Sequence, residues 1–221
     1  MKLALALVLS MATLASAAPG RDQLYRATLL QAAPGRLLEL IEEVRPSASE
    51  RRIVLRHSQG DFWDLMLLEP IAGYAAHIGD RPSEPASLEL VAWREDGFYR
   101  GPPWSALAAY ETSNLFHVEM FIALAGKRAG LVEQREMENI YHGALKRPTN
   151  AIFVRELGAS WDCFTIGAYD SWTHYAEQDD IAEEDAEKAA KAAGFDGGAY
   201  IGTYLRTLIR SHHDTLAGPI R

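Results

Sequence analysis

The stretch LFHVEMFIALAGKRAGLVE, from Leu115 to Glu133, decides the fold. Its first residues alternate in hydrophobicity, which predicts a β-strand, and a glycine-containing turn then leads into a helical pattern. A second copy, LYRATLLQAAPGRLLELIE from Leu24 to Glu42, aligns with it without a gap. The aromatic residue in the strand and the glycine of the turn recur, so the chain repeats a strand–turn–helix unit.

The similarity continues beyond the helix. IVLRHSQGDFWDLMLLEP, beginning at Ile53, resembles IFVRELGASWDCFTIGAY, beginning at Ile152, and each contains an arginine, a turn and a Trp-Asp pair. This element order resembles the ferredoxin-like unit. We expect a signal peptide (1–17), a first ferredoxin-like repeat (18–79), a linker with a short helix (80–114), a second repeat (115–178) and a helical C-terminal extension (179–221).

The composition is that of an ordinary globular protein. The 221 residues are 48% hydrophobic and 24% charged, which permits one compact domain or two small ones. The net charge is −8 without a basic stripe, so nucleic acid is not an expected partner. Cys163 is the only cysteine, which excludes an intramolecular disulfide. It falls in a predicted strand without a basic neighbour, so we expect a buried, unreactive thiol.

The first 17 residues have the pattern of a secretory signal peptide. Lys2 precedes an apolar run from Leu3 to Leu14, and Ala-Ser-Ala at 15–17 provides a small-residue cleavage site. The apolar run is shorter than the roughly 20 residues of a membrane span. We therefore expect cleavage after residue 17, a secreted or periplasmic protein, and no membrane contact afterwards.

Two ferredoxin-like units in one chain resemble the dimeric α+β barrel superfamily in its tandem, fused form. That superfamily includes NIPSNAP-like and antibiotic-monooxygenase-like proteins, and the haem-binding chlorite dismutase and dye-peroxidase groups. The resemblance implies an α+β class, two facing sheets that form a barrel, and helices on the outside. It is compatible with a monomer or a homodimer. No cofactor is expected from the sequence, although the resemblance leaves open haem, with His117 or His142 as axial ligand.

Strand alternation then predicts a site. Phe116, Val118, Met120 and Ile122 share one face of their strand, which suits packing under helices, so we expect the opposite, polar faces to line the barrel cavity. Arginines there would bind an anion, a histidine beside a carboxylate would be an acid–base pair, and tryptophans would offer flat apolar surface. The candidate catalytic residues are His117 and Glu119, and the candidate ligand-binding residues are Arg26, Arg56, Arg155, Trp63 and Trp161.

Two further groups are weaker candidates. Glu138 and His142 are four residues apart on a predicted helix, a spacing that can hold a metal but is also frequent on solvated helices. His212-His213-Asp214 falls near the end of a last helix expected over 199–215, where histidines would face the negative end of the helix dipole. We therefore expect no metal site.

Three functions remain open from the sequence. The first is binding of a small apolar or aromatic anionic molecule in the barrel cavity. The second is an enzyme that uses His117 in the same cavity, either cofactor-free and oxygenase-like or haem-dependent. The third is a structural or interaction protein, in which Glu119 and the arginines form an inert salt-bridge network, because buried charges are normally paired.

Overall fold

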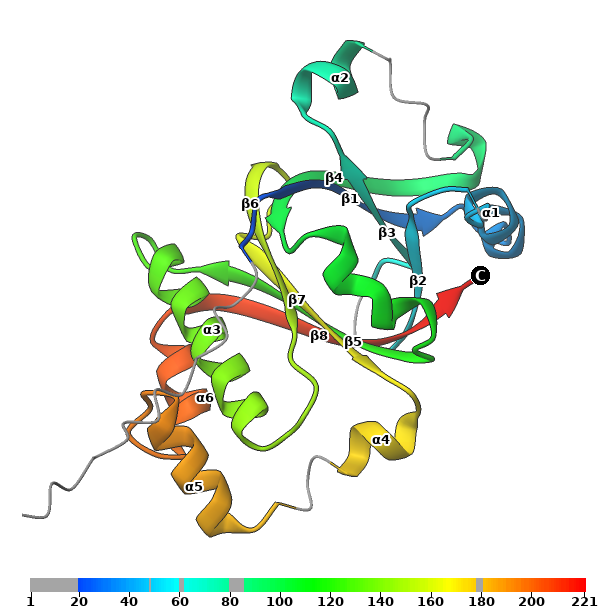
Figure 1. Ribbon diagram of the computed structural model, residues 1–221. Helices are drawn as coiled ribbons and strands as arrows, with labels where there is room; N and C mark the ends of the chain where they lie inside the picture. The colour runs from blue at the N-terminus through cyan, green and yellow to red at the C-terminus, as the bar shows by residue number, and fades with distance from the viewer. Residues whose placement is uncertain (1–19, 48, 60–61, 80–85, 178–180) are drawn as a thin grey trace, which may run out of the picture.

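The computed structural model describes residues 20–47, 49–59, 62–79, 86–177 and 181–221, so the predicted signal peptide lies outside the described residues. Eight antiparallel strands close into a barrel in the order β1-β3-β2-β8-β5-β7-β6-β4 (Figure 1). The strands are β1 (Gln23–Ala32), β2 (Ile53–Gln59), β3 (Leu65–Ile71), β4 (Val91–Gly101), β5 (Leu115–Ala123), β6 (Ala151–Gly158), β7 (Cys163–Tyr169) and β8 (Ile209–Ile220).

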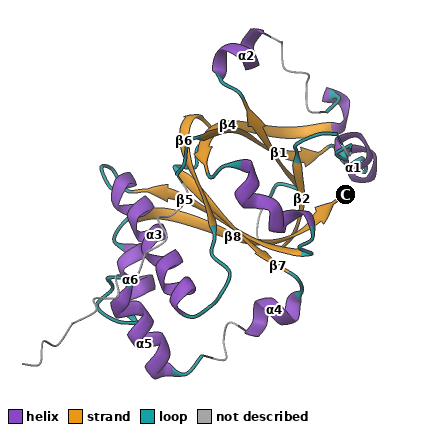
Figure 2. Cartoon of the chain, in the orientation of Figure 1, coloured by secondary structure: helices purple, strands orange, loops and turns teal. Residues whose placement is uncertain are grey.

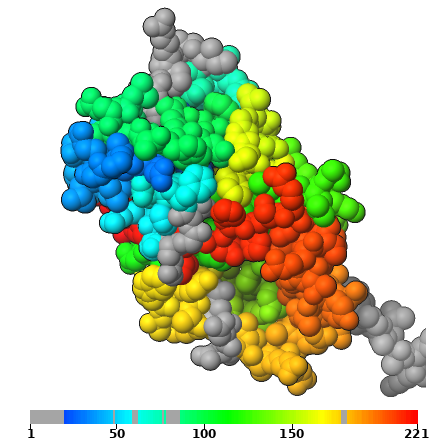
Figure 3. All heavy atoms as spheres, turned by 180° about the vertical axis from the view of Figure 1, so that it is seen from behind, coloured from blue at the N-terminus to red at the C-terminus, as the bar shows by residue number. Residues whose placement is uncertain are grey.

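Helices cover parts of the outside of the barrel (Figure 2). α1 packs on the outer face of β1, β2 and β3. α3 packs on the outer face of β5 and β7, and α5 and α6 pack against α3. In the view from behind, the orange residues of the last helices and the blue N-terminal residues lie at opposite sides of the molecule (Figure 3). The helices are α1 (Leu37–Val44), α2 (Tyr74–Gly79), α3 (Arg128–Ala144), α4 (Trp172–Ala176), α5 (Glu183–Ala192) and α6 (Tyr200–Arg206), with 3₁₀ segments η1 (Leu88–Leu90) and η2 (Trp104–Glu111).

The predicted α+β class is confirmed, and the strands and helices predicted on either side of the first turn of each half are present. The turn between strand and helix explains the glycine common to both halves. Gly35 has φ 78° and Gly126 has φ 75°, a left-handed conformation that residues with a Cβ rarely adopt. Each strand therefore enters its helix through the same kind of turn.

The segment expected as a linker over 80–114 contains a long strand: only the short η1 and η2 segments are helical among its described residues, and the chain between them forms β4. β4 pairs along almost the whole of β1 on one side and with β6 on the other. Without β4, both of those strands would present open edges, which proteins rarely leave uncovered. Long-range strand pairing therefore overrides the local helical pattern.

The last helix predicted over 199–215 is wrong in the same way. α6 ends at Arg206, and Ile209–Ile220 forms β8, which lies between β2 and β5. His212, His213 and Asp214 consequently stand in a strand, so their predicted position at a helix end is wrong. Adjacent residues of a strand point to opposite faces, which separates His213 from its two neighbours.

The barrel interior is apolar, and the prediction that polar faces point inward is wrong. The buried residues of β5 that enter the interior cluster are Phe116, Val118 and Met120, whereas His117 and Glu119 face outward. The reason is that two sheets facing each other form a core about 10 Å thick, which must be filled with side chains. The interior aromatic residues are Tyr25, Trp63, Tyr99, Phe116, Phe153, Trp161 and Phe164.

The repeated Trp-Asp pairs have a structural role. Trp63 and Trp161 are buried in the interior cluster. Asp64 accepts a hydrogen bond from the backbone N–H of Ala32, and Asp162 accepts one from the N–H of Ala123, both at 2.8 Å. Each aspartate therefore secures the end of the first strand of its half.

The described part of the chain contains no helix long and apolar enough to cross a membrane.

We predict that Phe164→Ala lowers the free energy of unfolding by about 3–5 kcal/mol, as aromatic truncations in cores do. The Phe164 ring is fully buried and lies 4.6 Å from that of Phe153 and 4.7 Å from that of Tyr99, between ring centroids. Urea denaturation measures the change. Leu157→Ala is the control, because Leu157 is 58% exposed and should change stability by only about 0.5 kcal/mol. Similar small losses in both variants would contradict the packed interior.

Candidate functional site

The charged residues that form the two candidate sites lie on the outside of the barrel, whereas His213 of β8 points inward against Trp161. On the first half, Arg26 is 5% exposed and its Nε donates to Asp96 Oδ1 at 2.9 Å. Thr28 donates to the same oxygen at 2.7 Å, and Arg94 forms an ion pair with the other. Burial acts to raise the pKa of Asp96, but the bonds from Arg94, Thr28 and Arg26 outweigh it and hold that pKa below its usual value.

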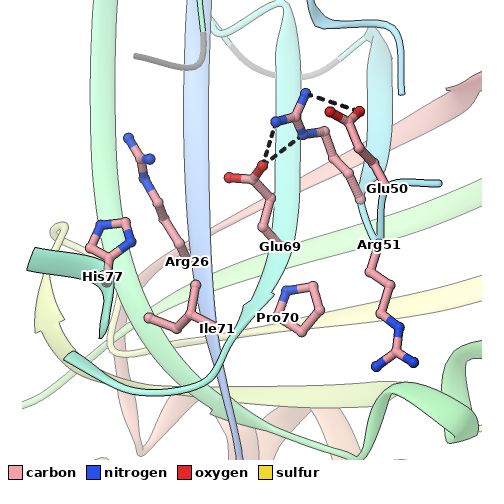
Figure 4. Close-up of a pocket in the computed structure, with 8 residues that line it drawn as sticks. Arg26, Glu50, Arg51, Glu69, Pro70, Ile71 and His77 are labelled. Atoms are coloured by element: carbon pink, nitrogen blue, oxygen red, sulfur yellow. Dashed lines mark hydrogen bonds and ion pairs between the residues drawn. The ribbon is translucent and has the colours of Figure 1, made fainter. Parts of the chain in front are cut away.

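A cavity of about 360 Å³ opens beside Arg26 on this outer face (Figure 4). Arg52 lies on its wall and donates to Glu69 from Nε at 2.7 Å, with Glu50 3.8 Å from its Nη1. We call this space the arginine cavity; its lining residues are Arg26, Glu50, Arg51, Arg52, Glu69, Pro70, Ile71 and His77.

The arginine cavity carries more positive than negative side chains. Arg26 uses its Nε on Asp96, and Figure 4 shows its Nη atoms at the far end of the side chain, between His77 and Glu69. Arg51 makes no ion pair among the described residues and points away from the Arg52 ion pairs. Guanidinium groups with unused N–H donors are the usual partners of carboxylates and phosphates.

The outer face of the second half carries a different group. His117, Glu119 and Asp214 have potential ligand atoms that all lie within 4.8 Å of one another. Glu119 stands directly opposite Asp214 of β8 on one side and Thr165 of β7 on the other. The Thr165 hydroxyl donates to Glu119 at 3.0 Å, and His117 lies edge-on to Tyr175 with ring centroids 5.6 Å apart.

Arg135 of α3 covers this group from above. Its side chain is 3% exposed, its Nη1 lies 3.4 Å from both Glu119 oxygens, and its Nη2 forms an ion pair with Glu138. The guanidinium also lies 4.8 Å from the centre of the Phe121 ring. Burial opposes ionisation of Glu138, but its contacts with His142 and Arg135 outweigh burial and lower its pKa. Glu138 and His142 therefore do lie together, as members of an ion-pair network.

The structure does not bring the predicted site residues into one cavity, so that prediction is wrong. Only His117 and Glu119 lie together, while Arg26 belongs to the other half of the barrel. Arg56 is exposed on β2. Arg155 is held at the β6–β7 turn, where its Nη1 donates to Ala159 O at 2.7 Å and its Nη2 to Asp162 at 2.6 Å.

Trp63 and Trp161 fill the interior and reach neither outer face. The sequence analysis also missed Arg51, Arg52 and His77, and it did not associate Asp214 with His117 and Glu119. The adjacent Arg51 and Arg52 just before β2 could have indicated a basic site. Asp214 could not be placed beside His117, because its segment was predicted to be a helix and is a strand.

Cys163 is buried under α3, as expected. Burial raises the pKa of its thiol to about 12. At neutral pH the group is a protonated thiol, whereas a nucleophile needs the thiolate.

Neither His117 nor His142, the two axial ligands that the resemblance left open, stands where it could hold a haem. A haem needs an apolar slot beside an available axial side chain. His142 lies 3.7 Å from Glu138 in the ion-pair network, and His117 stands among carboxylates. A second cavity, of about 600 Å³ between α3 and α5, has no histidine, cysteine, methionine or tyrosine in its lining, which consists of Ala144, Leu145, Lys146, Arg147, Ile181, Ala182, Asp185, Lys188, Ala189 and Ala192.

We predict that Glu138→Gln destabilises the protein at pH 7 by about 1–3 kcal/mol, because buried Arg135 loses a charged partner. The lowered pKa of Glu138 means that its stabilisation is present above the unfolded glutamate pKa of about 4.3 and is lost as the pH falls through the folded pKa. Denaturation between pH 3 and 8 should therefore show the two proteins converging in acid. A constant difference at every pH would contradict this assignment.

Comparison with known proteins gives the fold but no close relative. No family model and no curated protein sequence matches this chain. An anthrone oxidase-like protein superposes with a TM-score of 0.60 at 12% identity, over 90% of this chain and 92% of that protein. A Fusobacterium nucleatum protein assigned provisionally as a monooxygenase gives 0.58 at 9% identity, over 90% and 93%.

A similarly assigned protein of Lactobacillus acidophilus gives a TM-score of 0.54 at 7% identity, over 90% of this chain and 94% of that protein. A protein assigned provisionally as a chlorite dismutase gives 0.52 at 8% identity, over 90% and 95%. Sequence identities this low show a shared fold and nothing about activity. The chain therefore shares the fold of these proteins, and this is the α+β barrel that the sequence resemblance implied.

Proposed function

We propose that the protein binds a small anionic molecule in the arginine cavity. The observation that carries this proposal is Arg26, a nearly buried arginine whose Nε is used on Asp96 and whose remaining donors lie at the cavity. Arg51 adds a second guanidinium without an ion-pair partner among the described residues. The anion would therefore replace water at donors that the protein itself leaves unused.

The cavity also limits the chemical class of the ligand. Its volume of about 360 Å³ is at the lower end of the range for small-molecule sites, roughly 300–1,000 Å³. Pro70 and Ile71 contribute apolar wall beside the arginines. A ligand with a carboxylate or phosphate on a small apolar or aromatic body would match both the arginines and the apolar wall of the cavity. This retains the class of ligand predicted from the sequence and moves it from the barrel interior to the outer face.

We predict that Arg51→Gln weakens this binding about tenfold or more, because a hydrogen bond to a charged group contributes roughly 1.5–3 kcal/mol. Isothermal titration of the purified chain with benzoate, 4-hydroxybenzoate and inorganic phosphate measures it. Arg51 is exposed, so its substitution should leave the fold intact.

Arg56→Gln is the matched control, since Arg56 is an exposed arginine of the same half that does not line the cavity. It should bind like the unmodified protein. Equal losses in both variants would indicate general electrostatic attraction, and failure of all three probes to bind would remove the proposal for these ligand classes.

Oxygenase-like chemistry at His117 is a second candidate. It is favoured by the place of His117 beside Glu119 and Asp214, since an imidazole oriented by a neighbouring carboxylate is the usual arrangement of a general base. The names of the similar structures, an anthrone oxidase-like protein and provisional monooxygenases, point the same way. Oxygen uptake with anthrone as the probe, lost in His117→Gln, would support turnover, and uptake unchanged in that variant would exclude His117 as the base.

We also infer that the chain is a fused tandem of two ferredoxin-like units. One support is the strand order, because β1 lies between β3 and β4 just as β5 lies between β7 and β8. The other is that Asp64 and Asp162 each accept a hydrogen bond from the backbone at the end of the first strand of their half. Export rests on the sequence pattern of residues 1–17. N-terminal sequencing of the protein recovered from expressing cells would give Ala18 if the signal is cut as proposed, and Met1 if it is not.

A further inference from the structure

We propose that His117, Glu119 and Asp214 form a binding site for a single divalent transition-metal ion. We call them the His-Glu-Asp cluster. One imidazole and two carboxylates offer ligand atoms within 4.8 Å of one another, the span that atoms around one ion require. The cluster lies on the second half of the barrel, so this proposal is independent of the arginine cavity.

The strands place the three ligands without help from a flexible loop. His117 and Glu119 are two residues apart on β5 and therefore share its outer face. Asp214 stands directly opposite Glu119 in the β5–β8 ladder. Ligands on paired strands are held by the ladder itself, which is a more rigid support than a loop.

The charges of the cluster are unbalanced without a cation. Two carboxylates directly opposite each other on an antiparallel pair destabilise the sheet. Glu119, Asp214 and nearby Glu138 supply three negative charges, and Arg135 supplies one positive charge. Asp214 also lies 3.3 Å from His212 Nε2, and that imidazole is cationic only when protonated. A divalent ion would neutralise the excess.

The first half shows how the same position is arranged when no metal is needed. There Thr28 stands opposite Asp96, as Glu119 stands opposite Asp214. Asp96 receives a hydrogen bond from the Thr28 hydroxyl and ion pairs from Arg26 and Arg94. The second half has a carboxylate in place of that hydroxyl and His117 in place of Arg26, so a cation supplied by the protein is replaced by a metal ligand.

Arg135 and the surroundings leave room for an ion. Both Arg135–Glu119 contacts are 3.4 Å, longer than the roughly 2.7–2.9 Å of a strong charged bond, so the Glu119 oxygens keep lone pairs for a metal. The Asp214 side chain is 49% exposed, which gives an ion a route from solvent. Mixed nitrogen and carboxylate ligands suit Zn²⁺ and Mn²⁺, with water in the remaining positions.

The test uses the full chain without a histidine tag, stripped of metal with EDTA and titrated with ZnCl₂ or MnCl₂. Calorimetry should show one ion per chain. At about 100-fold excess over Kd, the Tm should rise by roughly 5–10 °C. His117→Gln and Asp214→Asn should each weaken binding about 100-fold and remove most of that rise. Asp170→Asn is the matched control, because Asp170 and His174 form a carboxylate–histidine pair 3.5 Å apart that is not part of the cluster.

Asp214→Asn guards against a trivial loss of folding. It removes one of two facing carboxylates, so the metal-free variant should melt at or above the Tm of the metal-free parent protein. A metal-free variant that melts well below the parent would show that Asp214 stabilises the fold without an ion. The proposal is also overturned if the parent protein binds neither ion stoichiometrically, or if both cluster variants bind as tightly as the parent.

Discussion

Closure of the barrel is the constraint on which the rest of the structure depends. Every strand of a closed antiparallel sheet has a partner on both sides, so β4 and β8 must fill the gaps between the two groups of strands. Once the sheet is closed, its inner surface cannot be solvated and must be filled by side chains. Phe116, Phe153 and Phe164 do this, and Glu119, on the same strand as Phe116, is left on the outside.

This explains why the sequence predicted the class of fold but placed the site on the wrong side of the sheet. Alternation in β5 correctly separates Phe116, Val118 and Met120 from His117 and Glu119. It cannot tell which face is covered by helices and which by the opposite sheet, because both environments are apolar. The repeated strand–turn–helix pattern was local, and it appeared in the structure where expected. β4 and β8 are specified by partners far away in the sequence, so their local patterns were misleading.

The candidate site was predictable to the extent that it lies on one strand. His117 and Glu119 are two residues apart, and their shared face follows from strand geometry. Asp214 joins them only through the β5–β8 pairing, which no local signal in the sequence announces. Arg26 was correctly recognised as a charge in a strand, but its neighbours Arg51 and His77 come from a loop and from α2. Trp63 and Trp161 recur in the two halves because they pack in the barrel interior.

The two outer faces show how one scaffold can carry opposite charges at equivalent positions. On β1, Arg26 stands two residues before Thr28, which lies opposite Asp96. On β5, His117 stands two residues before Glu119, which lies opposite Asp214. With arginine and threonine, the aspartate is satisfied within the protein and surplus guanidinium groups face a cavity. With histidine and glutamate, the aspartate faces a second carboxylate and the surplus charge is negative. The interior packing is unaffected by this exchange, because these side chains point away from it. Residues on the outer face can therefore change charge while barrel closure and the core remain the same, and this separates the determinants of surface charge from those of the fold.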